Sequence, residues 1–134
     1  LQEIAWHFGD HEFNGECCGG LSFVEFTALK KMNENKEMSI QELGAALNFT
    51  KSGATRVTNR LEDKGYIRRQ RSPLDGRVCC ITVTAAGTDI LKKITEKYIA
   101  YLEKMLKDME PQAIDHIKEV LALLVKSVYQ QAPR

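Results

Sequence analysis

The sequence has 134 residues, which is enough for one compact domain with its own hydrophobic core. Its 43% hydrophobic and 28% charged residues are typical of a soluble globular protein, and no apolar run approaches the roughly 20 residues of a membrane span. No positively charged stretch followed by an apolar one, the pattern of a secretory signal peptide, is visible before the four cysteines. We therefore expect reduced thiols in a cytoplasmic protein without a membrane partner, and not a disulfide framework.

The net charge of +1 hides an uneven distribution. Between Lys51 and Arg77 the chain carries eight Lys/Arg against three Asp/Glu, a local balance of +5. A solvated surface would explain such a segment, and so would a surface that faces phosphates. The charge alone leaves both interpretations open.

The first twenty residues hold four glycines and predict a short helix or helix remnant followed by a loop. Two capping boxes come next, each with a serine followed three residues later by a glutamate. Ser22 and Glu25 open a helix in "LSFVEFTALKKM", and Ser39 and Glu42 open a short one in "IQELGAALN". The polar segment "ENKEM" between them predicts a turn.

A third helix is predicted in "KSGATRVTNRLEDK", with Gly65 just past its end. Its apolar positions, Ala54, Val57 and Leu61, have the spacing of one helix face. Two helices joined by a tight turn, the second basic and polar outward, are typical of a helix-turn-helix. The outward side chains are those of Ser52, Thr55, Arg56, Asn59 and Arg60.

A β-hairpin is predicted directly after this helix, because "YIRRQR" and "RVCCITVT" are β-prone and "SPLDG" has turn chemistry. This is the position of the wing in a winged helix. Strand alternation puts Cys79 on the apolar face as a small core residue and leaves Cys80 partly exposed. The arms of the hairpin carry Arg68, Arg69, Arg71 and Arg77.

Two long helices complete the prediction. Thr84 caps a helix from about Ala85 to Met109, and Pro111 stands at the first position of the next. The last helix has a heptad-like apolar seam. Because these stripes exceed what one small winged helix can cover, they favour dimerisation. The seam consists of Ile114, Ile117, Leu121, Leu124 and Val128.

In the order and content of these pieces, from about residue 21 to 130, the sequence resembles the MarR family of bacterial winged-helix regulators. The most diagnostic parts are R-L-E-x-K-G followed by two hydrophobic residues and x-R, then D-x-R, then T-x-x-G. The resemblance implies a mainly α fold with a small β-hairpin wing. It assigns 1–20 to the dimerisation side, 21–84 to the DNA-binding lobe and 85–134 to C-terminal dimerisation helices, within one structural unit.

The family implies a homodimer on the double-stranded DNA of a palindromic operator, acting as a repressor that a small effector relieves. Carried over by position, the base and phosphate contacts on the recognition helix are Lys51, Ser52, Thr55, Arg56 and Asn59. The outward Arg60 and the hairpin's Arg71 complete this set. Arg77 resembles the minor-groove residue, and Asp75 is expected to hold the wing through an ion pair.

Two positions depart from the family pattern. Gly76 stands where the family often has an arginine, which removes a positive side chain from the wing tip. Gly53 lies inside the recognition helix, where glycine costs about 1 kcal/mol relative to alanine. A close approach to the DNA backbone is the interpretation that the sequence suggests for Gly53.

Cys17 and Cys18 lie in the glycine-rich loop "NGECCGG" and are the candidate effector sensors. A thiolate pair favours soft metal ions or oxidants, and His7, His11 and His116 are candidate co-ligands. An organic effector in the same region, and plain loop residues, remain as alternatives. A structural zinc site is poorly supported, because the spacing is not that of paired C-x-x-C motifs.

Two other classes of function compete with DNA binding. A thiol- or metal-dependent enzyme is disfavoured, because no nucleophile, base and orienting group occur together. A winged helix that binds protein is disfavoured by the outward Arg56 and Arg60, since such a module has no need of a basic face. The prediction is therefore a regulator and not an enzyme.

Overall fold

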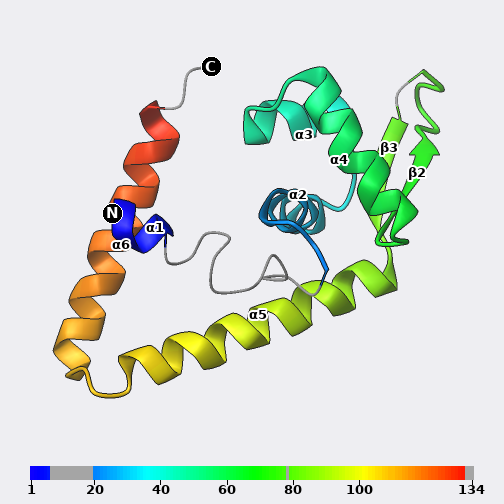
Figure 1. Cartoon of the computed structure of the whole chain (residues 1–134). Coiled ribbons are helices and arrows are strands. Elements are labelled where there is room, and N and C mark those ends of the chain that lie inside the picture. The colour runs from blue at the N-terminus through cyan, green and yellow to red at the C-terminus, as the bar shows by residue number, and fades with distance from the viewer. Residues whose placement is uncertain (7–19, 78, 132–134) are drawn as a thin grey trace. The chain divides into compact units, whose positions relative to one another are not determined.

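The computed structural model describes residues 1–6, 20–77 and 79–131, with the backbone alone at Cys79. The chain is mainly helical with a small antiparallel sheet, which confirms the predicted fold class (Figure 1). The elements are α1 (Gln2–Trp6), α2 (Phe23–Glu34), β1 (Met38–Ser39), α3 (Ile40–Leu47), α4 (Lys51–Asp63), β2 (Ile67–Arg71), β3 (Cys79–Val83), α5 (Ala85–Leu106) and α6 (Pro111–Gln131).

Both predicted capping boxes are present. The Ser22 hydroxyl accepts a hydrogen bond from the Glu25 N–H at 3.1 Å, and Glu25 Oε2 accepts one from the Ser22 N–H at 3.1 Å. Ser39 and Glu42 make the same reciprocal pair, at 3.1 and 2.7 Å, before α3. Each box satisfies two N–H groups at the helix start, so α2 and α3 begin where the sequence predicts.

The turn between α3 and α4 depends on a left-handed residue. Asn48 caps α3 with φ 54° and ψ 41°, a conformation that asparagine tolerates better than most residues. Thr50 then caps α4 by accepting a hydrogen bond from the Gly53 N–H at 3.1 Å. Past the other end of α4, Gly65 has φ +77°, as expected for the residue that follows a helix. The helix-turn-helix is confirmed.

The sheet has three strands in the order β1-β3-β2, all antiparallel. The predicted hairpin is confirmed, with Ile67 opposite Val83 and Arg71 opposite Cys79. The expectation of a plain turn in "ENKEM" is wrong at its end, because Met38 pairs with Ile81. A two-residue strand is too short to show alternation, and only its distant partner β3 defines it.

The core of the lobe lies between α2, α3, α4 and the sheet, and the start of α5 adds to it. The inward stripe predicted for the third helix, Ala54, Val57 and Leu61, is buried. The buried apolar residues are Leu21, Ala28, Leu29, Met32, Met38, Leu43, Ala54, Val57, Leu61, Ile67, Ile81, Leu91 and Ile94.

The motif T-x-x-G fixes the start of α5. The Thr84 hydroxyl donates to the Gly65 carbonyl at 2.7 Å and accepts from the Gly87 N–H at 3.1 Å. The Thr84 N–H donates to the Tyr66 carbonyl at 3.0 Å. A Cβ atom on Gly87 would lie 2.2 Å from the Tyr66 oxygen, so only glycine fits there. The residues just after α4 and the start of α5 are therefore tied together.

The described chain divides into two compact units, Leu1–Glu96 and Lys97–Arg134. The division falls inside α5, twelve residues past the boundary that the sequence suggests, because the buried Leu91 and Ile94 belong to the core of the first unit. In the second unit, α5 ends at Leu106, slightly before the expected Met109. None of the helices among the described residues is long and apolar enough to cross a bilayer.

Candidate nucleic-acid interface

Helix α4 presents one polar, basic face to solvent and buries the other. Its buried side consists of Ala54, Val57, Thr58 and Leu61. Burial of this stripe fixes the rotation of the helix, so the opposite residues must face outward. A shallow depression on the outer surface is lined by Thr50, Lys51, Ser52, Thr55, Arg56 and Asn59. Five of the six recognition-helix residues predicted from the sequence line this depression, and Arg60 is exposed one residue further on.

Hydroxyl groups gather at the N-terminus of α4. The Thr50 and Ser52 hydroxyls lie 3.2 Å apart, and the Thr55 hydroxyl donates to the Lys51 carbonyl at 2.9 Å. A helix N-terminus carries partial positive charge and free N–H groups, which suits phosphate oxygens. The first turn of α4 holds no acidic residue that would oppose this.

The structure explains why position 53 is a glycine, which the sequence did not show. A Cβ atom there would lie 3.1 Å from the Thr50 hydroxyl oxygen, the same atom that caps the helix. A larger residue would have to push the capping group aside by a few tenths of an ångström. Crowding at the cap therefore offsets the helix propensity that alanine would add.

Thr58 is the buried polar residue of α4 that the sequence pattern missed. Its side chain is fully buried, and its hydroxyl donates to the Ala54 carbonyl at 2.7 Å. Because a threonine can satisfy its hydroxyl within its own helix, it fits an apolar face. Hydropathy alone assigns it to the polar side, whereas its position four residues after Ala54 and three before Leu61 places it on the buried face.

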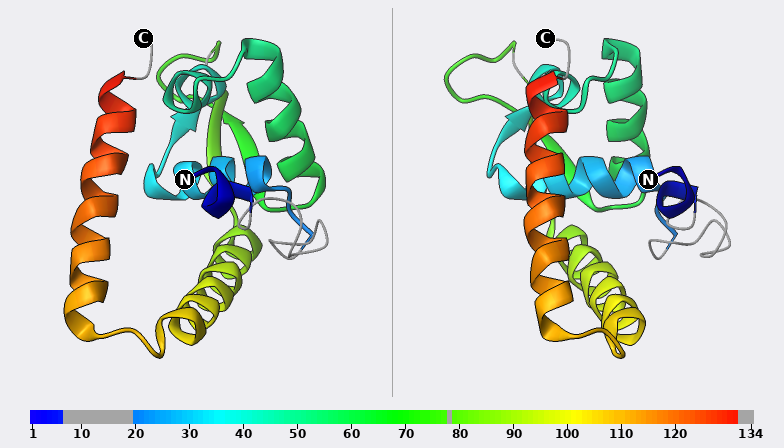
Figure 2. Two further views of the ribbon diagram at one scale, coloured as in Figure 1. Left: turned by 60° about the vertical axis from the view of Figure 1, so that its left-hand side comes forward. Right: turned by 90° about the vertical axis from the view of Figure 1, so that its left-hand side faces the viewer.

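The wing loop projects away from the helices of the lobe (Figure 2, right). Arg71 and Arg77 are exposed on it, and Leu74 at its tip is 98% exposed. Asp75 Oδ1 accepts a hydrogen bond from the Arg77 N–H at 3.0 Å. Asp75 thus shapes the loop through a backbone hydrogen bond, and the structure records no ion pair between the side chains of Asp75 and Arg77, both of which it describes.

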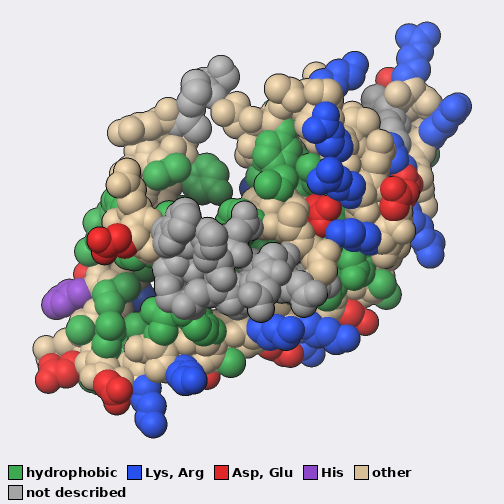
Figure 3. Space-filling view, in the orientation of Figure 1, with side chains coloured by type: hydrophobic (Ala, Val, Ile, Leu, Met, Phe, Trp, Pro, Cys, Tyr) green, Lys and Arg blue, Asp and Glu red, His purple; other side chains and the backbone are tan. Residues whose placement is uncertain are grey.

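Lys and Arg side chains gather over α4 and the hairpin, as Figure 3 shows for the first unit. They come from the segment with the local balance of +5, which the fold brings onto one side of the lobe. A surface of this kind attracts a polyanion and raises its rate of association.

Arg69 behaves differently from the other hairpin arginines. Its side chain is 27% exposed and turns toward α4. Its Nε donates to Glu62 Oε2 at 2.8 Å, and its Nη2 donates to the same oxygen and to Asn59 Oδ1, the latter at 2.6 Å. These hydrogen bonds hold the pKa of the Glu62 carboxyl below its usual value, helped by the positive charge of Arg69 and opposed by desolvation.

Glu62 and Arg69 were absent from the predicted site. The sequence places Arg69 on an arm of the hairpin together with Arg68, Arg71 and Arg77, and the family motif contains Glu62 and Arg69 without assigning them a role here. Only the pairing of β2 beside α4 brings them together. The one sequence signal that could have shown Arg69 to face inward was the alternation along β2, because Arg69 lies on the same strand face as the apolar Ile67.

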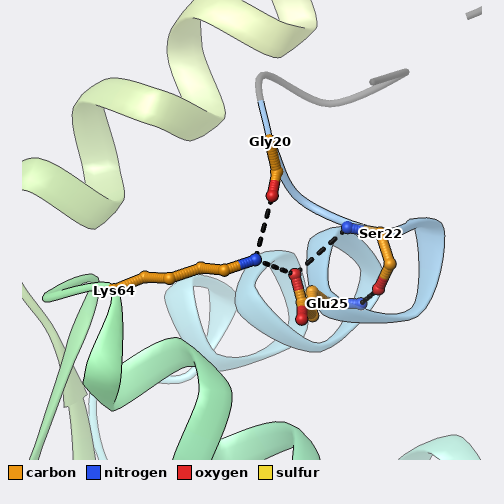
Figure 4. Close-up of polar contacts among 4 residues, drawn as sticks. All are labelled: Gly20, Ser22, Glu25 and Lys64. Carbon is orange, nitrogen blue, oxygen red and sulfur yellow. Dashed lines mark hydrogen bonds and ion pairs between the residues drawn. The ribbon is translucent and has the colours of Figure 1, made fainter. Parts of the chain in front are cut away.

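Lys64, the residue that follows α4, makes polar contacts with the start of α2 (Figure 4). Lys64, the C-cap of α4, directs its Nζ to Glu25 Oε2 at 2.6 Å and to the Gly20 carbonyl at 2.9 Å. Glu25 is 5% exposed and also accepts from the Ser22 N–H. The cluster joins residues 20–25 to Lys64, two segments that are distant in the sequence.

The candidate sensor residues Cys17 and Cys18, and the candidate ligands His7 and His11, lie outside the described residues. His116 is described and stands exposed on α6. Among residues 1–6, 20–77 and 79–131, no three His, Cys, Asp or Glu side chains come together in a way that would hold a metal ion. Cys80 is half-buried with a free thiol, as predicted.

A helix-turn-helix followed by a basic hairpin, with the outer helix face polar and the inner one buried, defines a winged-helix DNA-binding protein. The MarR family model matches residues 21–79. The uncharacterised transcriptional regulator YxaD of Bacillus subtilis is 29% identical over 81% of this chain and 76% of its own length.

Two solved structures share the fold. A MarR family protein from Bacillus stearothermophilus superposes with a TM-score of 0.83 at 21% identity, covering 96% of this chain and 90% of that one. The structure of Streptococcus pneumoniae FabT in complex with DNA gives 0.77 at 23% identity, with the same coverage. Over residues 21–79 the chain matches the MarR family, and its fold and its relatives are those of transcriptional regulators with a DNA-binding winged helix.

Proposed function

We propose that the chain is a cytoplasmic homodimeric repressor that binds a palindromic operator. One α4 helix of the dimer enters each of two successive major grooves, and the wings reach the adjacent minor grooves. The observation that carries this proposal is the face of α4 in which Lys51, Arg56 and Asn59 line one exposed depression while the opposite face is buried.

The chemistry of this face divides into two parts. Arg56 is exposed mid-helix, where a guanidinium can make a bidentate contact to a guanine edge that is worth about 1–3 kcal/mol of discrimination. Lys51, Ser52 and the N-terminal N–H groups suit phosphates and set the register. Arg77, exposed on the wing, suits a narrow minor groove.

Dimerisation is supported by α6, because none of its residues is buried within the chain. A helix with an apolar stripe in water is unfavourable, and a second copy that supplies the same stripe would cover it. Sedimentation should give a dimer for the natural chain and a monomer for Leu121→Glu. The exposed apolar residues of α6 are Ile117, Val120, Leu121, Leu123, Leu124, Val125, Val128 and Tyr129.

Repression follows from exclusion, because a dimer on an operator that overlaps a promoter blocks access by other proteins. A small effector would relieve it, with Cys17 and Cys18 as the thiol or soft-metal sensor and an organic ligand as the alternative. The link of Lys64 to Gly20 supports this proposal, since Gly20 is two residues past Cys18 and Lys64 caps the recognition helix.

The DNA-binding proposal is tested by selecting DNA sites from a random pool with the purified chain and then titrating them by fluorescence anisotropy. Affinity should fall steeply between about 50 and 200 mM salt, as expected when basic groups release counterions from phosphates. Arg56→Ala should lose the preference for the selected site and remain a dimer. Full retention of that preference by Arg56→Ala would remove Arg56 from the site.

The effector proposal needs a separate experiment. The natural chain and the double variant Cys17→Ser/Cys18→Ser should be titrated with operator in the presence of Zn²⁺, an oxidant, or a panel of organic ligands. Loss of the metal or oxidant response in the variant supports thiol sensing. An unchanged response in the variant would discard it in favour of the organic ligand.

A further inference from the structure

Asn59 is held by a residue from another element. It lies on the exposed face of α4, in the same depression as Arg56, and its Oδ1 accepts a hydrogen bond from Arg69 Nη2 at 2.6 Å. Arg69 belongs to β2 and is fixed in turn by Glu62, which accepts from its Nε at 2.8 Å. Glu62 stands three residues after Asn59, so both partners lie on one side of the helix.

The chemistry of arginine decides which way the Asn59 amide points. A guanidinium has five N–H donors and no acceptor, so the group that faces it must be the amide oxygen. The oxygen and nitrogen of an asparagine are otherwise assigned only from such a network. With Oδ1 engaged toward β2, the Nδ2 amino group is the part of Asn59 that remains for a partner outside the protein.

Charge balance adds to this arrangement. Glu62 is 37% exposed, and a free carboxylate beside the DNA-facing surface would repel phosphates. Arg69 neutralises it through two hydrogen bonds to Glu62 Oε2, and these bonds lower the pKa of the Glu62 carboxyl. The charge of Arg69 is therefore balanced by Glu62 within the protein, and we do not expect Arg69 to contact a DNA phosphate.

We propose that Arg69 is a positioning residue for base recognition, which orients the Asn59 amide so that its amino group donates to an acceptor on a base edge in the major groove. The acceptor is one of guanine O6 or N7, adenine N7 or thymine O4, and a cytosine at that place, whose edge offers an amino donor, is rejected. This inference rests on the proposed binding of DNA by α4.

The first step of the test locates the base that Asn59 reads. Selection of DNA sites with the natural chain and with Asn59→Ala should show one operator position, and its symmetry mate, at which the preference collapses in the variant. The expected loss of discrimination at that position is about tenfold. Equal preferences for both proteins at every position would overturn the inference.

The second step of the test removes the hydrogen bond by which Arg69 orients Asn59 and leaves the net charge unchanged. In the double variant Glu62→Gln/Arg69→Gln the net charge of the lobe is unchanged, so affinity for random DNA should be retained. The preference at the Asn59 position should drop about as much as in Asn59→Ala, and adding Asn59→Ala to the double variant should cost nothing further. A double variant that keeps the natural preference would overturn the role of Arg69.

The matched controls separate positioning from folding and from general affinity. Arg68→Gln changes the exposed neighbour on the same strand, so it should weaken binding to all sites and leave the base preference intact. Arg69→Lys keeps the charge opposite Glu62 but lacks the planar fork, so it should fold and still lose the preference. A base preference in Arg69→Lys equal to that of the natural chain would contradict the proposal even if the double variant fails to fold.

The same experiments distinguish a failure of the proposed DNA binding from a failure of the role of Arg69. If the natural chain selects no DNA site over random sequence, then DNA recognition by α4 itself is wrong. If it selects a site that depends on Arg56 but not on Arg69, only the positioning role is wrong.

Discussion

Lys64 Nζ lies 2.6 Å from Glu25 Oε2, and this contact joins the end of α4 to the first turn of α2. The Glu25 side chain is almost fully buried, while the Lys64 side chain is 38% exposed. The same ammonium donates to the Gly20 carbonyl (Figure 4). The orientation of α4 relative to α2 therefore rests on a polar contact as well as on the apolar core.

Replacing Lys64 by methionine should destabilise the protein. The change keeps most of the aliphatic stem but leaves the buried Glu25 carboxylate without its cation, which we expect to cost about 1–3 kcal/mol of unfolding free energy. Urea denaturation measures it. The double variant Lys64→Met/Glu25→Gln should recover part of the loss, and an additive effect of the two changes would argue against a direct interaction.

Gly87→Ala should also destabilise the lobe, through a clash. The new Cβ would lie 2.2 Å from the Tyr66 carbonyl oxygen, a backbone atom that cannot turn away. We expect a loss of about 1–3 kcal/mol in unfolding free energy, seen as a lower melting temperature. Gly76→Ala is the matched control, because no atom lies within 4 Å of the Cβ that it adds.

The Arg69–Glu62 pair should make stability depend on pH. Because the pKa of Glu62 is lowered from its ordinary value of 4.5, the contribution of the pair is complete above that value. It disappears as the pH falls through the lower pKa of the folded state. The difference in unfolding free energy between the natural chain and Glu62→Gln should therefore be present at pH 7 and vanish in acid.

This comparison isolates Glu62 from other carboxyls. The pKa of Glu42 is also lowered, by hydrogen bonds from the Ser39 backbone and side chain, but its effect is common to both proteins and cancels. Circular dichroism with urea at a series of pH values supplies the measurement. A difference that stays constant from pH 7 to well below 4.5 would contradict the assignment.

Arg77→Ala should weaken binding to operator and random DNA by similar factors. Arg77 is exposed on a loop that carries no base-reading helix, so its charge contributes through phosphates and the minor groove. The slope of log affinity against log salt should become shallower by about 1 per protomer. Anisotropy titrations at several salt concentrations measure both quantities, and an unchanged slope would place Arg77 away from the DNA.

The sequence by itself determined much of this protein, because its signals are local. The capping boxes at Ser22 and Ser39 fixed helix starts, the stripe of Ala54, Val57 and Leu61 fixed which face of α4 is buried, and Gly65 fixed its end. Each of these needs only neighbours within one or two helical turns. The outward residues of α4 followed directly from that stripe.

Only the tertiary structure decided the rest, because it depends on contacts between distant segments. Strand β1 exists through its pairing with β3, and Gly87 is required by a carbonyl twenty-one residues earlier. Arg69 looks like any other hairpin arginine until β2 packs beside α4 and turns it onto Glu62 and Asn59. Periodicity reports which face a side chain occupies, whereas the partner that it meets there is set by the packing of the whole lobe.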